Sequence, residues 1–232
     1  MIKSKKTLTY AALIFIEAEA ALAILLQVTS SRTSEIISYS AIVLAALFFI
    51  IFAENSVPFF CTQIALFCTA CADYFLVYSV EIRQIPAMIL FSIAQIAYFL
   101  RLYLEDSNHK RKKTHIIIRI ALSVATIIVT LIILGNKSDA VALISMFYYA
   151  NLILNAIFAF LDFRNNKLFA IGLLLFILCD TVIGLSLIDT YIPLSPDSAI
   201  YKIIHSGFNL AWAFYVPSQT LIAISLLPKR LK

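Results

Sequence analysis

The sequence is poor in the residues that a water-soluble domain needs. Only 13% of its 232 residues are charged, and it contains four Gly, six Pro and one Trp. A soluble domain is usually about a quarter charged, so this scarcity excludes an ordinary soluble enzyme domain. The low Gly and Pro content also argues against a loop-rich or low-complexity chain. The net charge is +5, but the basic residues cluster at the ends of apolar segments, so we expect no nucleic-acid partner.

Residues that bind metals or form disulfides are also few. The four cysteines, Cys61, Cys68, Cys71 and Cys179, all fall inside apolar segments, where the Cys68-x-x-Cys71 pair is more typical of small-residue packing than of redox or metal chemistry. No second Cys pair or nearby His completes a ligand set, so we expect no metal and no cofactor. No Ser-His-Asp or Cys-His arrangement indicates a covalent acyl-enzyme.

Long apolar runs fill the sequence instead, because 62% of its residues are hydrophobic. A helix of about 20 apolar residues crosses a hydrocarbon core of about 30 Å. Eight such runs predict an all-α fold, a polytopic membrane bundle of eight transmembrane helices that forms one domain over residues 1–232. The predicted spans are Leu8–Val28, Glu35–Ala53, Val57–Val80, Ile85–Leu104, His115–Leu134, Ala140–Leu161, Leu168–Ile188 and Ala199–Leu227.

The distribution of Lys and Arg predicts the orientation. With the N-terminus in the cytoplasm, 14 of the 18 basic residues lie at cytoplasmic ends, Arg119 among them, and the other ends hold Arg32, Arg83, Lys137 and Lys202. This positive-inside asymmetry places both termini in the cytoplasm and the chain in the cell membrane. A cleaved signal peptide ending near Ala18–Ala20 is the alternative for the N-terminus, but the apolar run continues to Val28, which favours a span.

Two aspartates lie deep in predicted spans. An ionisable side chain at the bilayer centre costs about 2.5–3.5 kcal/mol, so Asp73 and Asp180 should face the bundle interior or a wet cavity. Neither has an obvious intramembrane Lys or Arg partner, since Arg119 lies near a span end where it can snorkel. The third and seventh spans run in the same direction and have similar residues before each Asp. A glutamine follows a small residue in each next span, so a four-plus-four internal repeat is an open hypothesis.

Other polar residues of the spans recur at helical spacing. Gln95 and Tyr98 share one side of the fourth span, and Tyr148, Asn151 and Asn155 share one side of the sixth. Trp212, Tyr215 and Gln219 lie on a common face of the eighth span, although Pro217 interrupts that helix. Hydrogen bonds that only hold helices together are the alternative interpretation of each such residue, at about 0.6–2 kcal/mol per bond.

Four ordered motifs resemble the YhhN family of eight-span membrane proteins over nearly the whole chain. They are Phe67-Cys68-Thr69-Ala70-Cys71-Ala72-Asp73, Ala94-Gln95-Ile96-Ala97-Tyr98, Phe176-Ile177-Leu178-Cys179-Asp180, and Tyr215 through Ser218-Gln219-Thr220-Leu221-Ile222-Ala223-Ile224-Ser225. The sequence departs from the family pattern at three positions. Ala72 replaces a Gly, Cys179 replaces a Ser, and position 95 is Gln rather than His.

The resemblance implies a lysoplasmalogenase, an enzyme that hydrolyses the vinyl ether of a lysophospholipid to a fatty aldehyde and a glycerophospho-base. Asp73 and Asp180 would be the catalytic acid and base, with Asp180 preferred as the acid. Gln95, Tyr98, Tyr148, Asn151, Asn155, Trp212, Tyr215 and Gln219 would bind the substrate or position water. The rival hypotheses are a proton-coupled transporter of small molecules or lipids, and a non-catalytic lipid-binding membrane protein.

Overall fold

A computed structural model describes residues 5–29, 31–79, 83–188, 191, 195–204 and 208–227. These residues form helices and connecting turns, and no strand occurs among them. The long helices are α1 (Lys5–Val28), α2 (Ser31–Phe52), α3 (Val57–Asp73), α4 (Gln84–Glu105), α5 (His109–Leu134), α6 (Ala140–Leu161) and α7 (Phe163–Ile188). Two short helices, η1 (Tyr74–Tyr78) and η2 (Gly135–Lys137), continue α3 and α5.

Seven helices of the described chain are long and apolar enough to cross a membrane. They correspond to the first seven predicted spans, so the chain is an integral membrane protein with a helical bundle fold. Capping residues explain where several helices begin. Ser56 caps α3 and Pro58 lies in its first turn, Asn108 caps α5, and Asp139 caps α6. These caps supply acceptors for backbone N–H groups that have no partner inside the helix.

The predicted eighth span is wrong as one continuous helix. Ala199–Leu227 contains α8 (Ala199–Ile204) and, after a bend at Phe208, α9 (Leu210–Ile224). The Asn209 side chain accepts a hydrogen bond from the backbone of Trp212 and begins α9. α9 has 15 residues, most of them apolar, and is therefore about 22 Å long, shorter than the other spans. The number of membrane crossings therefore stays a prediction.

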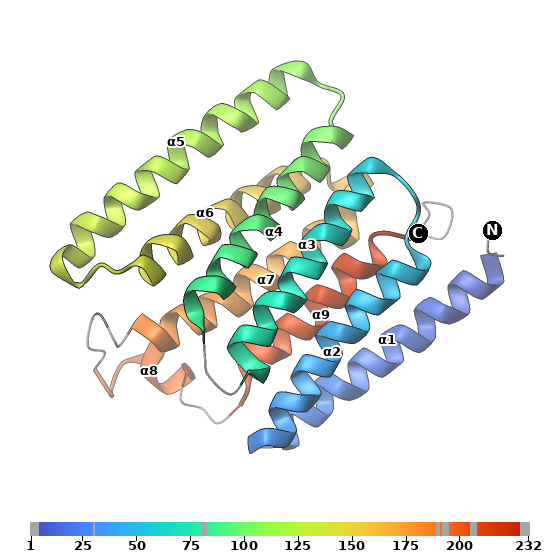
Figure 1. Cartoon of the computed structure of the whole chain (residues 1–232), viewed down its shortest axis with the longest axis horizontal. Coiled ribbons are helices and arrows are strands. Elements are labelled where there is room, and N and C mark those ends of the chain that lie inside the picture. The colour runs from blue at the N-terminus through green and yellow to red at the C-terminus, as the bar shows by residue number, and fades with distance from the viewer. Residues whose placement is uncertain are drawn as a thin grey trace.

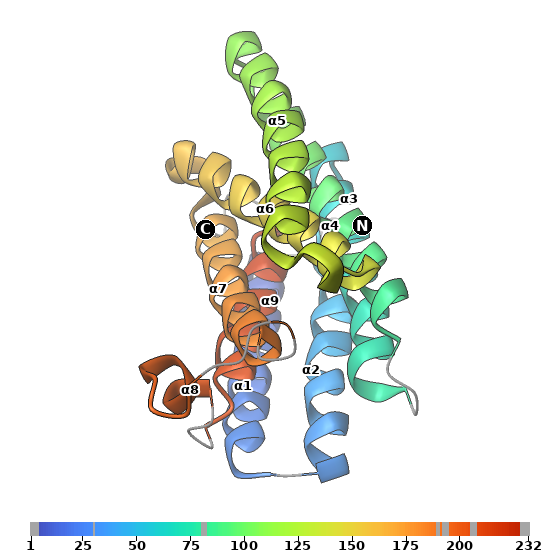
Figure 2. The same ribbon diagram turned by 90° about the vertical axis from the view of Figure 1, so that its left-hand side faces the viewer.

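α7 and α9 form one of the most closely packed helix pairs of the bundle, together with α3 and α4. In Figure 1 most helices run roughly parallel, with α1 on one side and α5 on the other. Figure 2 shows that α5 leans away from α1 and α2; its main packing partner is α6. In contrast, α9 packs on α7, α1 and α2. The close approach of α9 to α7 depends on Gly172, whose carbonyl accepts a hydrogen bond of 2.8 Å from Ser218.

The described ends of the chain lie at the same end of the bundle. Gln27 at the end of α1 exchanges hydrogen bonds with the backbone of Asn209, where α9 begins. The two helices are therefore antiparallel, and the start of α1 lies beside the end of α9. This arrangement agrees with an even number of crossings. Which side of the membrane holds these ends stays a prediction.

Candidate active site

Asp73 lies at the junction of α3 with the π-helix η1. It is 3% exposed, and its Oδ2 accepts a hydrogen bond of 2.6 Å from the hydroxyl of Tyr215 on α9. A π-helical turn inside an α-helix is uncommon and often marks a functional site. No sequence feature predicts this turn, because the segment Tyr74–Tyr78 contains no Gly or Pro that would indicate a break.

Asp180 on α7 completes a pair of carboxylates. It is 8% exposed, and its Oδ2 has no hydrogen-bond partner among the described residues. The hydroxyl of Tyr148 on α6 faces its carboxylate, and Asp180 and Asp73 lie close enough to interact electrostatically. Side chains from α3, α6, α7 and α9 therefore meet in one place, which we call the carboxylate centre: Asp73, Tyr148, Asp180 and Tyr215.

Aromatic rings surround the carboxylate centre. Phe176 lies 5.4 Å from the ring of Tyr215, and Phe91 on α4 stacks on Tyr148 at 5.7 Å. Trp212 contacts the ring of Tyr215 edge-on at 5.4 Å. These rings exclude water from most of the centre, so its charges act in a medium of low dielectric constant. Of the predicted binding residues, Tyr148, Trp212 and Tyr215 belong to this centre.

Three other predicted binding residues, Gln95, Asn151 and Asn155, belong to a second polar cluster. Its middle is Arg119 on α5, which donates to Oδ1 of Asn151 at 2.5 Å and to Oδ1 of Asn155 at 2.6 Å. Asn155 in turn donates to the backbone and side-chain oxygens of Gln95 at 2.9 and 3.0 Å. Nε2 of His115 lies 3.0 Å from Arg119. We call these five residues the Arg119 cluster.

The expectation that Arg119 snorkels to the membrane edge is wrong. The residue is 9% exposed and its side chain points into the bundle, over the ring of Phe99 at 4.4 Å. Hydropathy alone places an Arg at the edge of a span, so the sequence analysis missed this role. The available signal was the four-residue spacing of His115 and Arg119, which puts both on one face of α5.

The last two predicted binding residues, Tyr98 and Gln219, lie in neither cluster. Both are buried, and among the described residues the Tyr98 hydroxyl and both amide atoms of Gln219 have no hydrogen-bond partner. One helical turn after Tyr98, the 1% exposed Arg101 donates to Ser225, the residue after α9, at 2.8 Å and to Thr62 on α3 at 3.3 Å. A line of polar groups therefore follows α4 and α9 away from the carboxylate centre.

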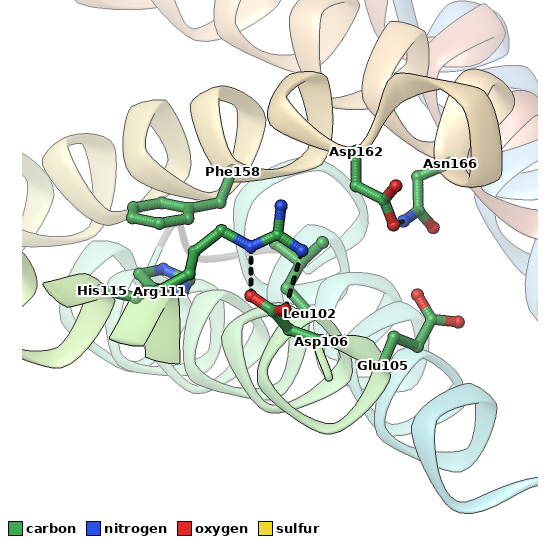
Figure 3. Close-up of a pocket in the computed structure, with 8 residues that line it drawn as sticks. All are labelled: Leu102, Glu105, Asp106, Arg111, His115, Phe158, Asp162 and Asn166. Atoms are coloured by element: carbon green, nitrogen blue, oxygen red, sulfur yellow. Dashed lines mark hydrogen bonds and ion pairs between the residues drawn. The ribbon is translucent and has the colours of Figure 1, made fainter. Parts of the chain in front are cut away.

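A shallow pocket opens where the α4–α5 and α6–α7 turns meet (Figure 3). It is lined by Leu102, Glu105, Asp106, Arg111, His115, Phe158, Asp162 and Asn166. Arg111 makes two hydrogen bonds to Asp106, and these bonds hold the pKa of the Asp106 carboxyl below its usual range. Within the described ranges, no three His, Cys, Asp or Glu side chains lie together as a metal site.

Comparison with known proteins agrees with the motifs. The family model of the YhhN family matches residues 34–226, from the first turns of α2 to just beyond the end of α9. The chain belongs to the YhhN family. The match includes both aspartates and all eight predicted binding residues. Neither the curated proteins nor the solved structures include a match to the chain.

Proposed function

We propose that this YhhN-family protein is a lysoplasmalogenase of the cell membrane, which hydrolyses the vinyl ether of a lysophospholipid to a fatty aldehyde and a glycerophospho-base. The observation that supports this function most is the pairing of Asp73 with Asp180 in one buried, aromatic centre. Two neighbouring carboxylates in such surroundings repel each other when both are ionised, so we assign one proton to the pair.

The first step is protonation of the vinyl ether at carbon. Asp180 is the better donor, because its Oδ2 has no hydrogen-bond partner among the described residues and so remains free to hold a proton. The proton forms a new C–H bond at the alkenyl carbon that is not attached to oxygen. The double bond supplies the electron pair, and the other carbon becomes an oxocarbenium ion.

The second step is capture of this cation by water. Asp73, whose carboxylate accepts the hydrogen bond of Tyr215, remains ionised and stabilises the adjacent positive charge, as carboxylates do in glycosidases. Water forms a C–O bond to the cationic carbon and returns one proton to Asp180. The resulting hemiacetal breaks its bond to the glycerol oxygen, and the products are the aldehyde and a free glycerol hydroxyl.

Aldehyde release from an alkenyl lysophospholipid by detergent-purified protein tests the proposal. We expect release by the wild type and a loss of at least a hundredfold in Asp73→Asn and Asp180→Asn, since general acid–base groups contribute about 10²–10⁴-fold. Asp197→Asn is the matched control, because Asp197 is exposed and lies outside α3 and α7, the helices that carry the two aspartates. Well-folded wild type that releases no aldehyde over a range of head groups and pH would remove the assignment.

The isotope content of the product tests the mechanism separately. A reaction run in D₂O should give an aldehyde with one deuterium on the carbon next to the carbonyl, because that carbon receives its proton from solvent through Asp180. An alkyl ether of the same chain length has no double bond to protonate and should give no product. Aldehyde without deuterium at that position would exclude protonation at carbon.

A proton-coupled transporter is the second candidate, and the line of buried polar groups formed by Tyr98, Gln219 and Arg101 supports it. Such a line, filled with water, would conduct protons between the carboxylate centre and one end of the bundle. Proton flux in sealed vesicles that depends on a solute and is lost in Gln219→Leu would favour transport. Product formation by detergent-purified protein, which has no sealed compartment, would favour the hydrolase.

A further inference from the structure

The buried positive charge of Arg119 is surrounded by neutral hydrogen-bond partners. Its hydrogen-bond partners are the amides of Asn151 and Asn155 and the imidazole of His115. Among the residues that the structure describes, no Asp or Glu forms an ion pair with Arg119. Arg101 differs, because its Nε lies 3.7 Å from a carboxylate oxygen of Glu105.

An arginine in a membrane span is unfavourable by about 2.5–3.5 kcal/mol, and it usually faces an opposite charge or a wet cavity. The unsatisfied groups of the cluster show what is missing. Nε of Arg119 and Nε2 of Gln95 are buried without a partner, and both are donors. Buried donors need acceptors, so an anion with several oxygens would satisfy the charge and the hydrogen bonds together.

The position of the cluster on α6 indicates which anion. Asn151 and Asn155 follow Tyr148 by three and seven residues, which puts them about 4.5 and 10.5 Å along the helix axis from the carboxylate centre. In a lysophospholipid, five bonds of about 1.5 Å separate the ether oxygen from phosphorus, an extended reach of roughly 6 Å. This length fits the interval between the two sites.

We propose that the Arg119 cluster binds the phosphate of the lysophospholipid, and so places its ether oxygen at Asp73 and Asp180. The proposal rests on the proposed function and adds the residue that selects phosphate-bearing substrates. The guanidinium of Arg119 supplies the charge, and its Nε–H and the amide of Gln95 supply donors. Asn151 and Asn155 keep the guanidinium in place.

The location of α5 suits a ligand that arrives from the bilayer. This helix packs chiefly on α6 and stands apart from α1 and α2 (Figure 2). Its outward side chains, such as Ile117 and Ile120, are exposed and apolar. Because the guanidinium of Arg119 points into the bundle over Phe99 of α4, a single-chain lipid would bring its phosphate to Arg119 between α5 and α4, and its chain would then meet the apolar side chains of α5.

The test compares two alkyl ethers that the hydrolase reaction leaves intact, so binding is measured without turnover. One is an alkyl lysophosphatidylethanolamine and the other is an alkylglycerol of the same chain length, which lacks the phosphate. We expect the purified wild type to bind the first at least tenfold more tightly, in line with a charge-assisted phosphate contact. In Arg119→Gln the ratio of the two dissociation constants should fall about tenfold.

A second variant keeps the test valid if Arg119→Gln does not fold. Asn151→Asp places a carboxylate at the atom that already accepts from Arg119, so the guanidinium gains an internal counterion and the fold keeps its contact. It should also lose the preference for phosphate. Arg164→Gln is the control, since it removes an exposed arginine outside both clusters and should leave the ratio intact.

Three outcomes would overturn the proposal. The first is a preference for phosphate that persists in both Arg119→Gln and Asn151→Asp. The second is equally tight binding of a two-chain phosphatidylethanolamine, which would make the cluster a site for a bilayer lipid. The third is no preference in the wild type. Aldehyde release is measured in a separate assay, so the hydrolase proposal can succeed where the phosphate site fails.

Discussion

The contact between α7 and α9 leads to a prediction that needs no assumption about chemistry. A methyl group added at Gly172 would lie 2.7 Å from Cγ1 of Ile222, 3.1 Å from the backbone oxygen of Ser218 and 3.2 Å from the backbone nitrogen of Ile222. Two of these atoms belong to the backbone of α9 and cannot move without the helix. Gly172→Ala must therefore push α7 and α9 apart.

Gly184→Ala provides the matched comparison within the same helix, because nothing lies within 4 Å of a methyl group there. Both substitutions gain about 0.5–1 kcal/mol from helix propensity. Only Gly172→Ala also suffers overpacking, which typically destabilises by about 1–3 kcal/mol. At about 2–4 °C for each kcal/mol in a chain of this size, the Gly172→Ala protein should melt roughly 2–12 °C below the Gly184→Ala protein.

Thermal unfolding of both variants in the same detergent measures this difference. Equal melting temperatures, or a more stable Gly172→Ala protein, would refute the close packing of α7 on α9. The same variant should also lower hydrolysis, because α7 carries Asp180 and α9 carries Tyr215. Gly184→Ala should retain the wild-type rate.

Three further predictions concern single side chains. Tyr215→Phe should lower the rate of aldehyde release by about tenfold or more, because it removes the 2.6 Å hydrogen bond that the Tyr215 hydroxyl donates to Asp73; an unchanged rate in steady-state assays would contradict this. Arg101→Gln should destabilise the protein by about 2–4 kcal/mol in denaturant unfolding. The variant loses the hydrogen bonds to Ser225 and Thr62 and the cation–π contact with the ring of Phe169 at 4.0 Å. Unchanged stability would contradict this prediction. Arg111 holds the pKa of Asp106 below its ordinary value. This contact therefore stabilises the fold fully at a pH above the unfolded pKa of about 3.9, and the stabilisation is lost as the pH falls through the lower pKa of the folded state. The stability difference between wild type and Asp106→Asn should therefore be present at pH 7 and disappear in strong acid. A difference that grew on acidification would contradict a lowered pKa of Asp106.

Hydropathy predicted the long helices well because membrane spans are specified by composition. The predicted range Ala140–Leu161 coincides with α6, and most other helix ends differ by a few residues. The largest difference at a start is in α5, which begins at His109 because Asn108 caps it. The run of basic residues after Asn108 is helical but polar, so a window that looks for apolar residues begins too late.

The break between α8 and α9 was missed for a related reason. Apolar residues on both sides of Phe208 give one continuous hydropathy signal, and a single Asn in such a stretch does not indicate that a helix begins there. The π-helix after Asp73 has no sequence signature either. Both features depend on how the chain packs against α1, α3 and α7, which a single sequence does not contain.

The candidate site was predicted in part. Burial energetics predicted that Asp73 and Asp180 face the bundle interior or a wet cavity, and the resemblance to the YhhN family implied that they act as a pair. The division of the other polar residues into separate clusters depends on α5. The helical-face argument grouped Asn151 and Asn155 with Tyr148, which is right for α6, but it could not show that Arg119 would cross to them from a neighbouring helix.

The separation of the carboxylate centre from the Arg119 cluster determines how reaction and substrate recognition depend on each other. A carboxylate pair alone would protonate any vinyl ether that reached it. In the proposed arrangement, the cation of Arg119 is held by Asn151 and Asn155, about one to two turns along α6 from Tyr148, and would admit only substrates that carry an anion at a set distance. Tyr148, Asn151 and Asn155 lie on one face of α6, so this helix sets the distance between reaction and recognition. Lengthening the substrate by one carbon between the ether oxygen and the phosphate should therefore reduce kcat more than it weakens binding, because the phosphate keeps its contact with Arg119 while the vinyl carbon moves past Asp180. Equal rates for both substrates would mean that the two sites act independently.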